Sequence, residues 1–394
     1  MKIHKIRLKN FKAFKNATMQ NISHLSVIVG INSTGKSSLF QVFTFIKEAF
    51  YTNINNALYK IGGANAFFEV RSRNSSENIE IEIQFYQKEK AALITYYLII
   101  GENQGIAFIE REILKYEDKN YKTPLHLLDF SKGRGSIVLN NMDFLKNINE
   151  LKKEDQRIKS DDILALKVLA QLERFPVAVS VGNFIENWHI SAFNINRVRL
   201  DKEMGYAEHL SIDGSNLPLV TEYLYKKYPQ IFNTILLKLS ERIPGIEKVE
   251  AKITEDGRVI LRFKDSSFEN PFLASNISDG TIKMFAYLVL LHDPKPHALL
   301  CVEEPENQLY PKLLWELAEE FRAYTTRGGQ VFVSTHSPGF LNAIALDEVF
   351  WLIKNNGCST ISKAENDQQI SAFMKNGDQM GYLWEQGFFE GVDY

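Results

Sequence analysis

A phosphate-binding loop is predicted near the start of the chain. The pattern G-x-x-x-x-G-K-[ST] fits Gly30 to Ser37, GINSTGKS. Glycines let the backbone curl so that successive N–H groups point at phosphate oxygens, and the N-terminus of a following helix adds its positive dipole. In such a loop Lys36 would reach the β- and γ-phosphates, and the hydroxyl of Ser37 would ligate Mg²⁺. The alternative is a Gly/Ser turn that merely precedes a helix.

Two carboxylates and a histidine follow apolar runs in the second half of the chain. Glu303 and Glu304 end the run ALLCV at residues 298–302. Beside a phosphate loop, Glu303 can hold the metal through water, and Glu304, pointing the other way, can polarise the attacking water. His336 follows the next apolar run, 32 residues after Glu304, and could contact the γ-phosphate. That separation leaves room for one helix and one strand, which could place His336 beside Glu304. The structural alternatives are a solvated strand end and a histidine without a ligand.

The elements that must hold the loop follow from hydrophobic periodicity in the first half of the chain. Alternating or short β-branched apolar patterns predict strands at residues 3–11, 25–29, 79–85, 93–100 and 106–115. A helix with one apolar stripe is predicted after Gly35, through Leu39, Val42, Phe43, Ile46 and Phe50. The stretch from about 66 to 115 is therefore expected to form an antiparallel β-rich layer.

From residue 298 onwards the chain alternates between strand and helix patterns. Strands are predicted at 298–302, 330–335 and 349–353, and a helix at 311–324. Ser278-Asp279-Gly280-Thr281 predicts the cap of a helix that runs through 284–291. This alternation is typical of an α/β fold with a mostly parallel sheet.

The middle of the chain has a different pattern. Residues 141–162 are polar, which predicts a loop or a solvated helix. Helices are expected from Ser160 to Leu172 and, after Pro218, from Leu219 to about Leu239, and a hairpin over 249–263 turns at Asp256-Gly257. We therefore predict three parts: 1–114 and 249–394 as two halves of one nucleotide-binding domain, separated by a helix-rich insertion at 115–248.

Composition excludes several classes of protein. The 394 residues are 45% hydrophobic and 24% charged, which is ordinary globular composition. The net charge of −2 argues against coating of nucleic acid through bulk charge. There is no run of about 18 apolar residues and no secretory signal, so we expect no membrane association. Cys301 and Cys358 cannot build a disulfide framework and are expected to be reduced thiols of a cytoplasmic protein.

The order of the motifs resembles the ABC-type ATPase heads of the SMC, RecF and OLD proteins. More closely, the chain is similar to the small stand-alone AAA-family ATP-binding proteins, which keep such a head without long coiled-coil arms. The segments that carry the resemblance are KIRLKNFKAF, GINSTGKS, SNISDGTIK, CVEEPENQLYP and STHSP. They cover roughly residues 1–50 and 270–345; the middle matches loosely, through IDGSNLP.

The resemblance implies an ABC-type P-loop NTPase head with an antiparallel β layer and a mixed, partly helical insertion. It implies ATP and Mg²⁺ as cofactors, Ser37 and Glu303 at the metal, and Glu304, His336 and Lys36 as catalytic residues. The segment Ser278, Asp279 and Gly280 stands where the ABC signature lies, which in the family contacts the γ-phosphate held by a second subunit. The implied nucleotide-binding residues are Gly30, Asn32, Ser33, Thr34, Gly35, Lys36, Ser37 and Ser38.

Three departures from the family pattern matter. Glu303 replaces the usual Walker B aspartate, a longer arm that still carries a carboxylate, so we expect activity to survive. The signature is ISDGT rather than LSGGQ, which argues against a membrane transporter subunit. No Q-loop glutamine can be assigned, because Gln84 fits a strand equally well.

The resemblance implies an ATP hydrolase whose ATP-bound heads pair and control a separate effector, such as a nuclease or toxin, in bacterial defence against phage. The alternative is a RecF-like DNA-binding repair ATPase; a catalytically dead scaffold is disfavoured because the motif residues are present.

Only 58 residues follow His336, too few for a TOPRIM nuclease domain. Two segments each keep two interpretations. A basic strip could contact phosphates or be a solvated face, and an aromatic tail could dock a partner or pack in the core. The strip is Lys2, Lys5, Lys9, Lys12 and Lys15, and the tail residues are Tyr382, Trp384, Phe388 and Phe389.

Overall fold

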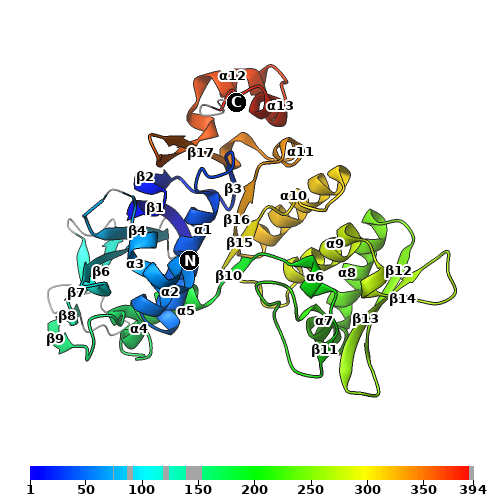
Figure 1. The fold of residues 1–394 in the computed structure, drawn as a ribbon, viewed down its shortest axis with the longest axis horizontal. Coiled ribbons are helices and arrows are strands. Elements are labelled where there is room, and N and C mark those ends of the chain that lie inside the picture. Colours follow the sequence, from blue (N-terminus) through cyan, green and yellow to red (C-terminus); the bar gives the residue numbers. More distant parts are fainter. Residues whose placement is uncertain (74, 87–91, 119–123, 139–152, 390–394) are drawn as a thin grey trace. The chain divides into compact units, whose positions relative to one another are not determined.

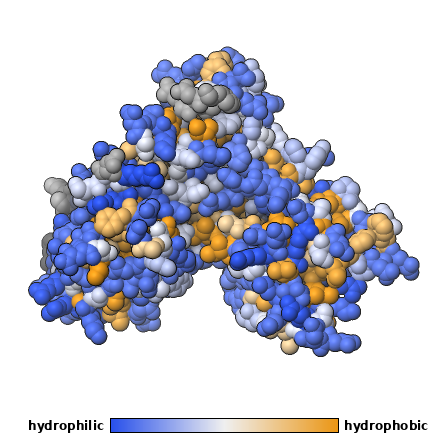
Figure 2. All heavy atoms as spheres, in the orientation of Figure 1, coloured by the Kyte–Doolittle hydropathy of each residue, from blue (hydrophilic) through white to orange (hydrophobic). Residues whose placement is uncertain are grey.

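A computed structural model describes residues 1–73, 75–86, 92–118, 124–138 and 153–389. The chain folds into two compact units, which Figure 1 shows as ribbons. Unit 1 comprises Met1–Trp188, Leu346–Asn376 and Gly387–Tyr394, and unit 2 comprises His189–Ala345 and Gly377–Gln386. Hydrophilic residues cover much of the face in Figure 2, with apolar groups between them, as the composition predicts.

Unit 1 contains the predicted antiparallel layer, in the order β2-β1-β4-β5-β6-β7-β8-β9. Its central strands alternate between buried apolar and half-buried polar residues, because one face packs on the core. The strands are β1 (Lys2–Phe11), β2 (Phe14–Gln20), β4 (Ile79–Tyr86), β5 (Ala92–Asn103), β6 (Ile106–Asp118), β7 (Leu125–Ser131), β8 (Arg134–Val138) and β9 (Lys153–Arg157).

Two details of this layer differ from the prediction. Residues 66–70 form the helix α3 (Ala66–Val70), because Phe67 and Val70 are buried at a helical spacing of three. The predicted stretch 66–115 therefore contributes strands to the layer only from Ile79 onwards. Residues 153–157 of the polar middle form strand β9 rather than a loop or helix, since they pair with β8. Residues 141–152 of that polar stretch lie outside the described residues.

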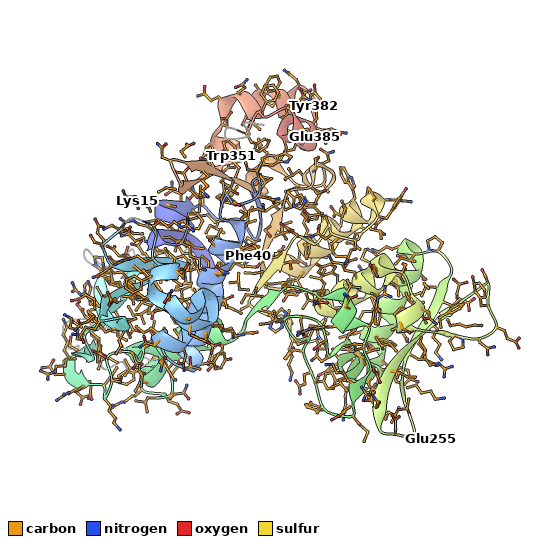
Figure 3. The ribbon with its side chains drawn as sticks, viewed as in Figure 1. Lys15, Phe40, Glu255, Trp351, Tyr382 and Glu385 are labelled. Carbon is orange, nitrogen blue, oxygen red and sulfur yellow. The ribbon has the colours of Figure 1, made fainter. Side chains whose placement is uncertain are left out.

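A second group of strands in unit 1 holds the predicted loop. β3 (Leu25–Val29) is fully buried and runs parallel to β17 (Val349–Asn355), which pairs antiparallel with β18 (Cys358–Lys363). Helix α1 (Lys36–Tyr51) follows β3 and buries the predicted apolar stripe; Phe40, labelled in Figure 3, is also buried on this helix. The other helices of unit 1 are α2 (Ile54–Gly62), α4 (Ala165–Leu169), α5 (Pro176–Glu186) and α12 (Gln368–Lys375).

The predicted helix from Ser160 to Leu172 is wrong at its start. Asp162 does not cap a helix, because its carboxylate accepts hydrogen bonds from Ser160 and from Asn55 Nδ2. The helix α4 begins only at Ala165. Its first N–H groups donate instead to Glu112 on β6, at 2.6 Å from Ala165 and 3.0 Å from Leu166. A carboxylate from a distant strand thus caps this helix.

Unit 2 contains the predicted alternation of strand and helix. β15 (Leu299–Glu303) lies between β10 (Trp188–Ser191) and β16 (Gln330–Thr335), and runs parallel to β16. α10 (Pro311–Thr326) connects these two parallel strands. α9 (Asp279–Leu291) is buried from Thr281 onwards because it is apolar on nearly every side. Three short helices also belong to this unit: α6 (Ile195–Val198), α11 (Pro338–Leu341) and α13 (Met380–Glu385).

The predicted hairpin is present as β12 (Ile246–Ile253) and β13 (Arg258–Asp265), with Glu255 at its turn in Figure 3. Short strands β11 (Lys202–Glu203) and β14 (Phe272–Leu273) pair with β13. The expected single helix to Leu239 is two helices, α7 (Leu217–Lys227) and α8 (Pro229–Arg242). Pro229 has no N–H and cannot continue the first helix.

The predicted three-part division stays a prediction; in the described residues, 115–248 contributes strands and helices to both units. Cys301 and Cys358 are both free thiols, and burial raises the pKa of Cys301. None of the helices in the described ranges has the length and apolar character needed to cross a bilayer.

Candidate nucleotide-binding site

The loop between β3 and α1 has the backbone of a phosphate cradle. Ser33 and Gly35 take positive φ angles of 67° and 99°, which turn successive peptide N–H groups towards one side. Thr34 closes the turn from within, because both its N–H (3.3 Å) and its hydroxyl (2.8 Å) donate to the carbonyl of Ile31. The loop is thus held in place by its own hydrogen bonds.

Gly30 is required by space rather than by backbone conformation. A Cβ atom at this position would lie 2.4 Å from Oγ1 of Thr34, far inside normal contact distance. Gly35 is required for both reasons, since it has positive φ and a Cβ there would lie 3.0 Å from Cβ of Ala13. The turn between β1 and β2 therefore packs behind the loop and supports it.

Lys36 is the first residue of α1 and is only 6% exposed. Its ammonium group donates to the carbonyl oxygens of Gly30 (2.6 Å) and Ile31 (3.3 Å). Asn32, Ser33 and Ser37 are exposed. A cradle that admits no Cβ at Gly30, a lysine at its base and an exposed hydroxyl at Ser37 together fit a phosphate chain with its Mg²⁺.

The carboxylates of unit 2 lie where β15 ends. Glu303 is in register with Ser334 of β16. Glu304 takes a positive φ of 44°, and its N–H donates to the carbonyl of Ser334 at 2.9 Å. Its carboxylate accepts a hydrogen bond of 3.1 Å from Nδ2 of Asn307. The chain thus turns sharply after Glu303: Glu303 has strand backbone, whereas Glu304 has a left-handed one.

His336 lies beside Glu304, as the sequence predicts, with 3.4 Å between Nδ1 and Oε1. A second carboxylate, Glu306, fixes the backbone around His336. Its Oε1 accepts hydrogen bonds from the hydroxyl of Thr335 (2.7 Å) and the N–H of His336 (3.1 Å). Oε2 of Glu306 is buried without a hydrogen-bond partner. The His336 side chain is 46% exposed, so a ligand can reach it.

Two further residues lie at this site that the sequence did not predict, Glu306 and Lys283. Lys283, on α9, donates to the carbonyl of Asn307 at 2.6 Å. Burial lowers the pKa of Lys283 to about 8, against the opposing effect of Glu306 and Glu304. No fixed spacing links Lys283 to the acids, but a lysine within an otherwise apolar helix was a usable signal. Glu306 had the weaker signal of a third acid within four residues.

The signature segment opens α9. Ser278 caps this helix, since its Oγ accepts the N–H of Thr281 at 3.2 Å. Asp279 forms an ion pair with Arg199, and a Cβ at Gly280 would lie 2.9 Å from the carbonyl of Gln308. Gln84 lies within β4 and donates to Glu82, so the strand interpretation holds for it.

The basic strip is largely compensated by unit 1 itself. Lys9 pairs with Glu77 (2.9 Å) and Glu80 (3.1 Å), and Lys5 pairs with Glu82 (3.2 Å). Lys12 donates to the carbonyl of Ile61, and Lys2 bonds to His24. Lys15, labelled in Figure 3, is exposed. The β1 face is therefore neither a simple solvated face nor a row of unpaired cations.

The aromatic tail mainly packs on its own units. Phe389 is buried against Trp351, with ring centroids 5.2 Å apart, and Phe388 contacts Phe373 at 4.7 Å. Trp384 is buried as well. Only Tyr382 is largely exposed (Figure 3). The core-packing interpretation thus holds for Phe389 and Trp384, whereas Phe388 is half-buried.

The fold and the loop together define a P-loop ATPase head of the ABC/SMC type. A solved SMC head, bound to the C-winged helix domain of ScpA, matches with a TM-score of 0.55 at 12% identity, over 92% of this chain and 97% of that one. The model of the family described as "AAA domain, putative AbiEii toxin, Type IV TA system" matches residues 25–342, and the chain belongs to that family. An "ATP/GTP phosphatase" of Helicobacter pylori is 21% identical over 393 residues, 97% of this chain and 98% of its own length.

Proposed function

We propose that the chain is a Mg²⁺-dependent ATPase in which the loop from Gly30 to Ser38 binds the nucleotide phosphates. The observation that carries this proposal is the loop itself, with Lys36 at its base and no room for a side chain at Gly30. Lys36 would exchange its carbonyl partners for phosphate oxygens, and Ser37 with Glu303 would hold the metal. Bound Mg²⁺ neutralises charge on the phosphates and orients them.

Glu304 is the proposed general base. Its carboxylate lies at a turn between strand and loop, with Asn307 on one oxygen and His336 near the other. A carboxylate fixed in this way can take a proton from water, and an imidazole beside it can hydrogen-bond a phosphate oxygen. We propose these roles for Glu304 and His336, in the cytoplasm, where ATP is available.

We further propose that two ATP-bound heads pair, each offering Ser278, Asp279 and Gly280 to the nucleotide of the other. The exposed carboxylate of Asp279 and the capped start of α9 suit a contact made by a second subunit. Pairing would control a separate effector, a nuclease or toxin, in defence against phage. The family description, which names a toxin–antitoxin system, and the partner-bound SMC head support a role with a second protein.

The solution mass of Glu304→Gln with and without ATP-Mg²⁺ tests this proposal. Slow hydrolysis should trap the paired state, so light scattering should shift from 45.3 kDa to about twice that mass. A variant that binds ATP yet stays monomeric would contradict pairing of the heads alone. Lys36→Ala is the control, because it should bind no ATP and show no shift. DNA binding that rises with ATP would instead favour the RecF-like alternative.

A further inference from the structure

A cluster of two imidazoles and one carboxylate lies in unit 2, away from the residues discussed above. Ligand atoms of His209, Asp293 and His297 all lie within 4.8 Å of one another. Asp293 and His297 are buried, and the side chain of His209 is 38% exposed. Nδ1 of His209 lies 2.6 Å from Oδ2 of Asp293. We propose that these three residues bind a divalent transition metal, Zn²⁺ by preference.

Each of the three residues is held in place by a further contact, at the backbone or the side chain. Asn216 donates to the carbonyl of His209 at 2.9 Å, and Oδ1 of Asp293 accepts the N–H of Lys295 at 2.8 Å. The carbonyl of His297 accepts the hydroxyl of Tyr324 at 2.9 Å, and its ring stacks on His189 with centroids 4.6 Å apart. Outer contacts that fix the backbone and rings of the ligands are typical of metal sites.

The donor set selects the metal. Imidazole nitrogen suits Zn²⁺, Cu²⁺, Fe²⁺ and Ni²⁺, whereas Mg²⁺ takes oxygen ligands and keeps its waters. Three protein ligands of the His₂Asp type leave one tetrahedral position for water. Since His209 is partly exposed, a metal and its water can reach the cluster from solvent.

The site is distinct from the proposed nucleotide Mg²⁺ site. Asp293 follows the C-terminal end of α9, and His297 precedes the first residue of β15. Glu303, the proposed metal ligand, ends β15 six residues after His297, and a strand rises about 3.3 Å per residue, so roughly 20 Å separates it from the cluster. A metal at the cluster would clamp the connection between α9 and β15 to the loop that carries His209.

The test uses the full chain without a histidine tag, stripped with a chelator and titrated with Co²⁺ and Zn²⁺ in excess Mg²⁺ and without nucleotide. Excess Mg²⁺ occupies oxygen-rich sites, so the signal reports nitrogen ligation. We expect one Co²⁺ per chain with the visible absorption of a four-coordinate site, displaced by one Zn²⁺. Absence of saturable binding would overturn the proposal and leave a metal-free His–Asp hydrogen bond.

Two variants and a matched control assign the site. His209→Ala should weaken Zn²⁺ binding at least about tenfold, since loss of even an outer-shell partner costs that much. Asp293→Asn keeps the acceptor for Lys295 and should also weaken binding, which guards against misfolding as the cause. His126→Ala is the control: it lies on β7 near Asp129 (3.3 Å), another His–Asp pair outside the cluster. Equal Zn²⁺ affinity in His209→Ala and His126→Ala would place the metal elsewhere.

Discussion

Glu306 supports His336 through the backbone rather than through the ring. One carboxylate oxygen of Glu306 accepts the N–H of His336 at 3.1 Å, whereas Nδ1 of the imidazole lies 3.6 Å from the same oxygen. The hydroxyl of Thr335 shares that oxygen. Glu306 thus fixes where the chain leaves β16, and with it the position of the imidazole beside Glu304.

This arrangement predicts a graded effect at position 306. Glu306→Ala leaves two donors unsatisfied and lets His336 move, so kcat should fall roughly tenfold to a hundredfold with KM little changed. Glu306→Gln keeps an oxygen acceptor for both donors and should restore most of the activity. Steady-state phosphate release measures both. Equal losses in the two variants would mean that the charge matters and not the acceptor.

Glu304→Gln separates binding from hydrolysis. Losing the proposed base should lower turnover by about a hundredfold to ten-thousandfold while a fluorescent ATP analogue binds as before. Glu319→Gln is the control, because Glu319 is an exposed acid on α10 that pairs with Arg322. Turnover of Glu304→Gln equal to that of the control would remove Glu304 from the mechanism.

The close approach at Gly30 predicts a rescue. In Gly30→Ala the new Cβ meets Oγ1 of Thr34, and overpacking of about 1–3 kcal/mol should weaken ATP binding roughly fivefold to 150-fold. Thr34→Ala removes that oxygen and, alone, costs only the bond to Ile31, about 1 kcal/mol. The double variant should therefore bind ATP better than Gly30→Ala. Additive losses in titrations of the three variants would refute the contact.

Glu112 makes the stability of unit 1 depend on pH. Burial raises its pKa to about 7, although Leu166, Ala165 and Tyr96 donate to it. Between pH 4.5 and 7 the carboxyl group of Glu112 is protonated in the folded state and ionised in the unfolded state. The free energy of unfolding therefore falls as pH rises through this range and stays constant above pH 7. The change is roughly 3 kcal/mol.

Denaturant unfolding from pH 5 to 8 measures this effect. Glu112→Gln keeps an acceptor for the α4 N–H groups and should flatten the decline. Glu110→Gln, two residues along β6 and paired with Lys132 at the surface, should leave the decline as it is. A decline of the same size in Glu112→Gln would assign the titration to another group.

The strands and the loop could be predicted because their signals are local. The run LSVIV, the glycines at 30 and 35 and the stripe from Leu39 to Phe50 each determine structure within a few residues. The proximity of His336 to Glu304 followed from parallel strand order alone. Periodicity and chain order thus predicted these strands and this helix, and the proximity of His336 to Glu304.

Two features could not be predicted because a distant residue competes with a local pattern. Asp162 has the residue type of a helix cap, but Asn55 and Ser160 take its carboxylate, and Glu112 caps the helix instead. The ion pairs of the basic strip could not be predicted, because they depend on the pairing of β1 with β4, where Glu80 lies in register with Lys9. Apart from that of Ser160 with Asp162, these pairings join residues more than 50 positions apart, and no spacing rule in one sequence reveals them.

The placement of the two thiols offers a way to attach a reporter dye. Cys301 is buried in the middle of β15, whereas Cys358 is only partly covered, so a maleimide should react selectively at Cys358. The next residue, Ser359, donates its N–H to Ala13 at 2.8 Å, directly behind Gly35 of the loop. A fluorophore on the unaltered sequence would therefore sit one residue from the support of the cradle, and its emission could follow occupancy in real time.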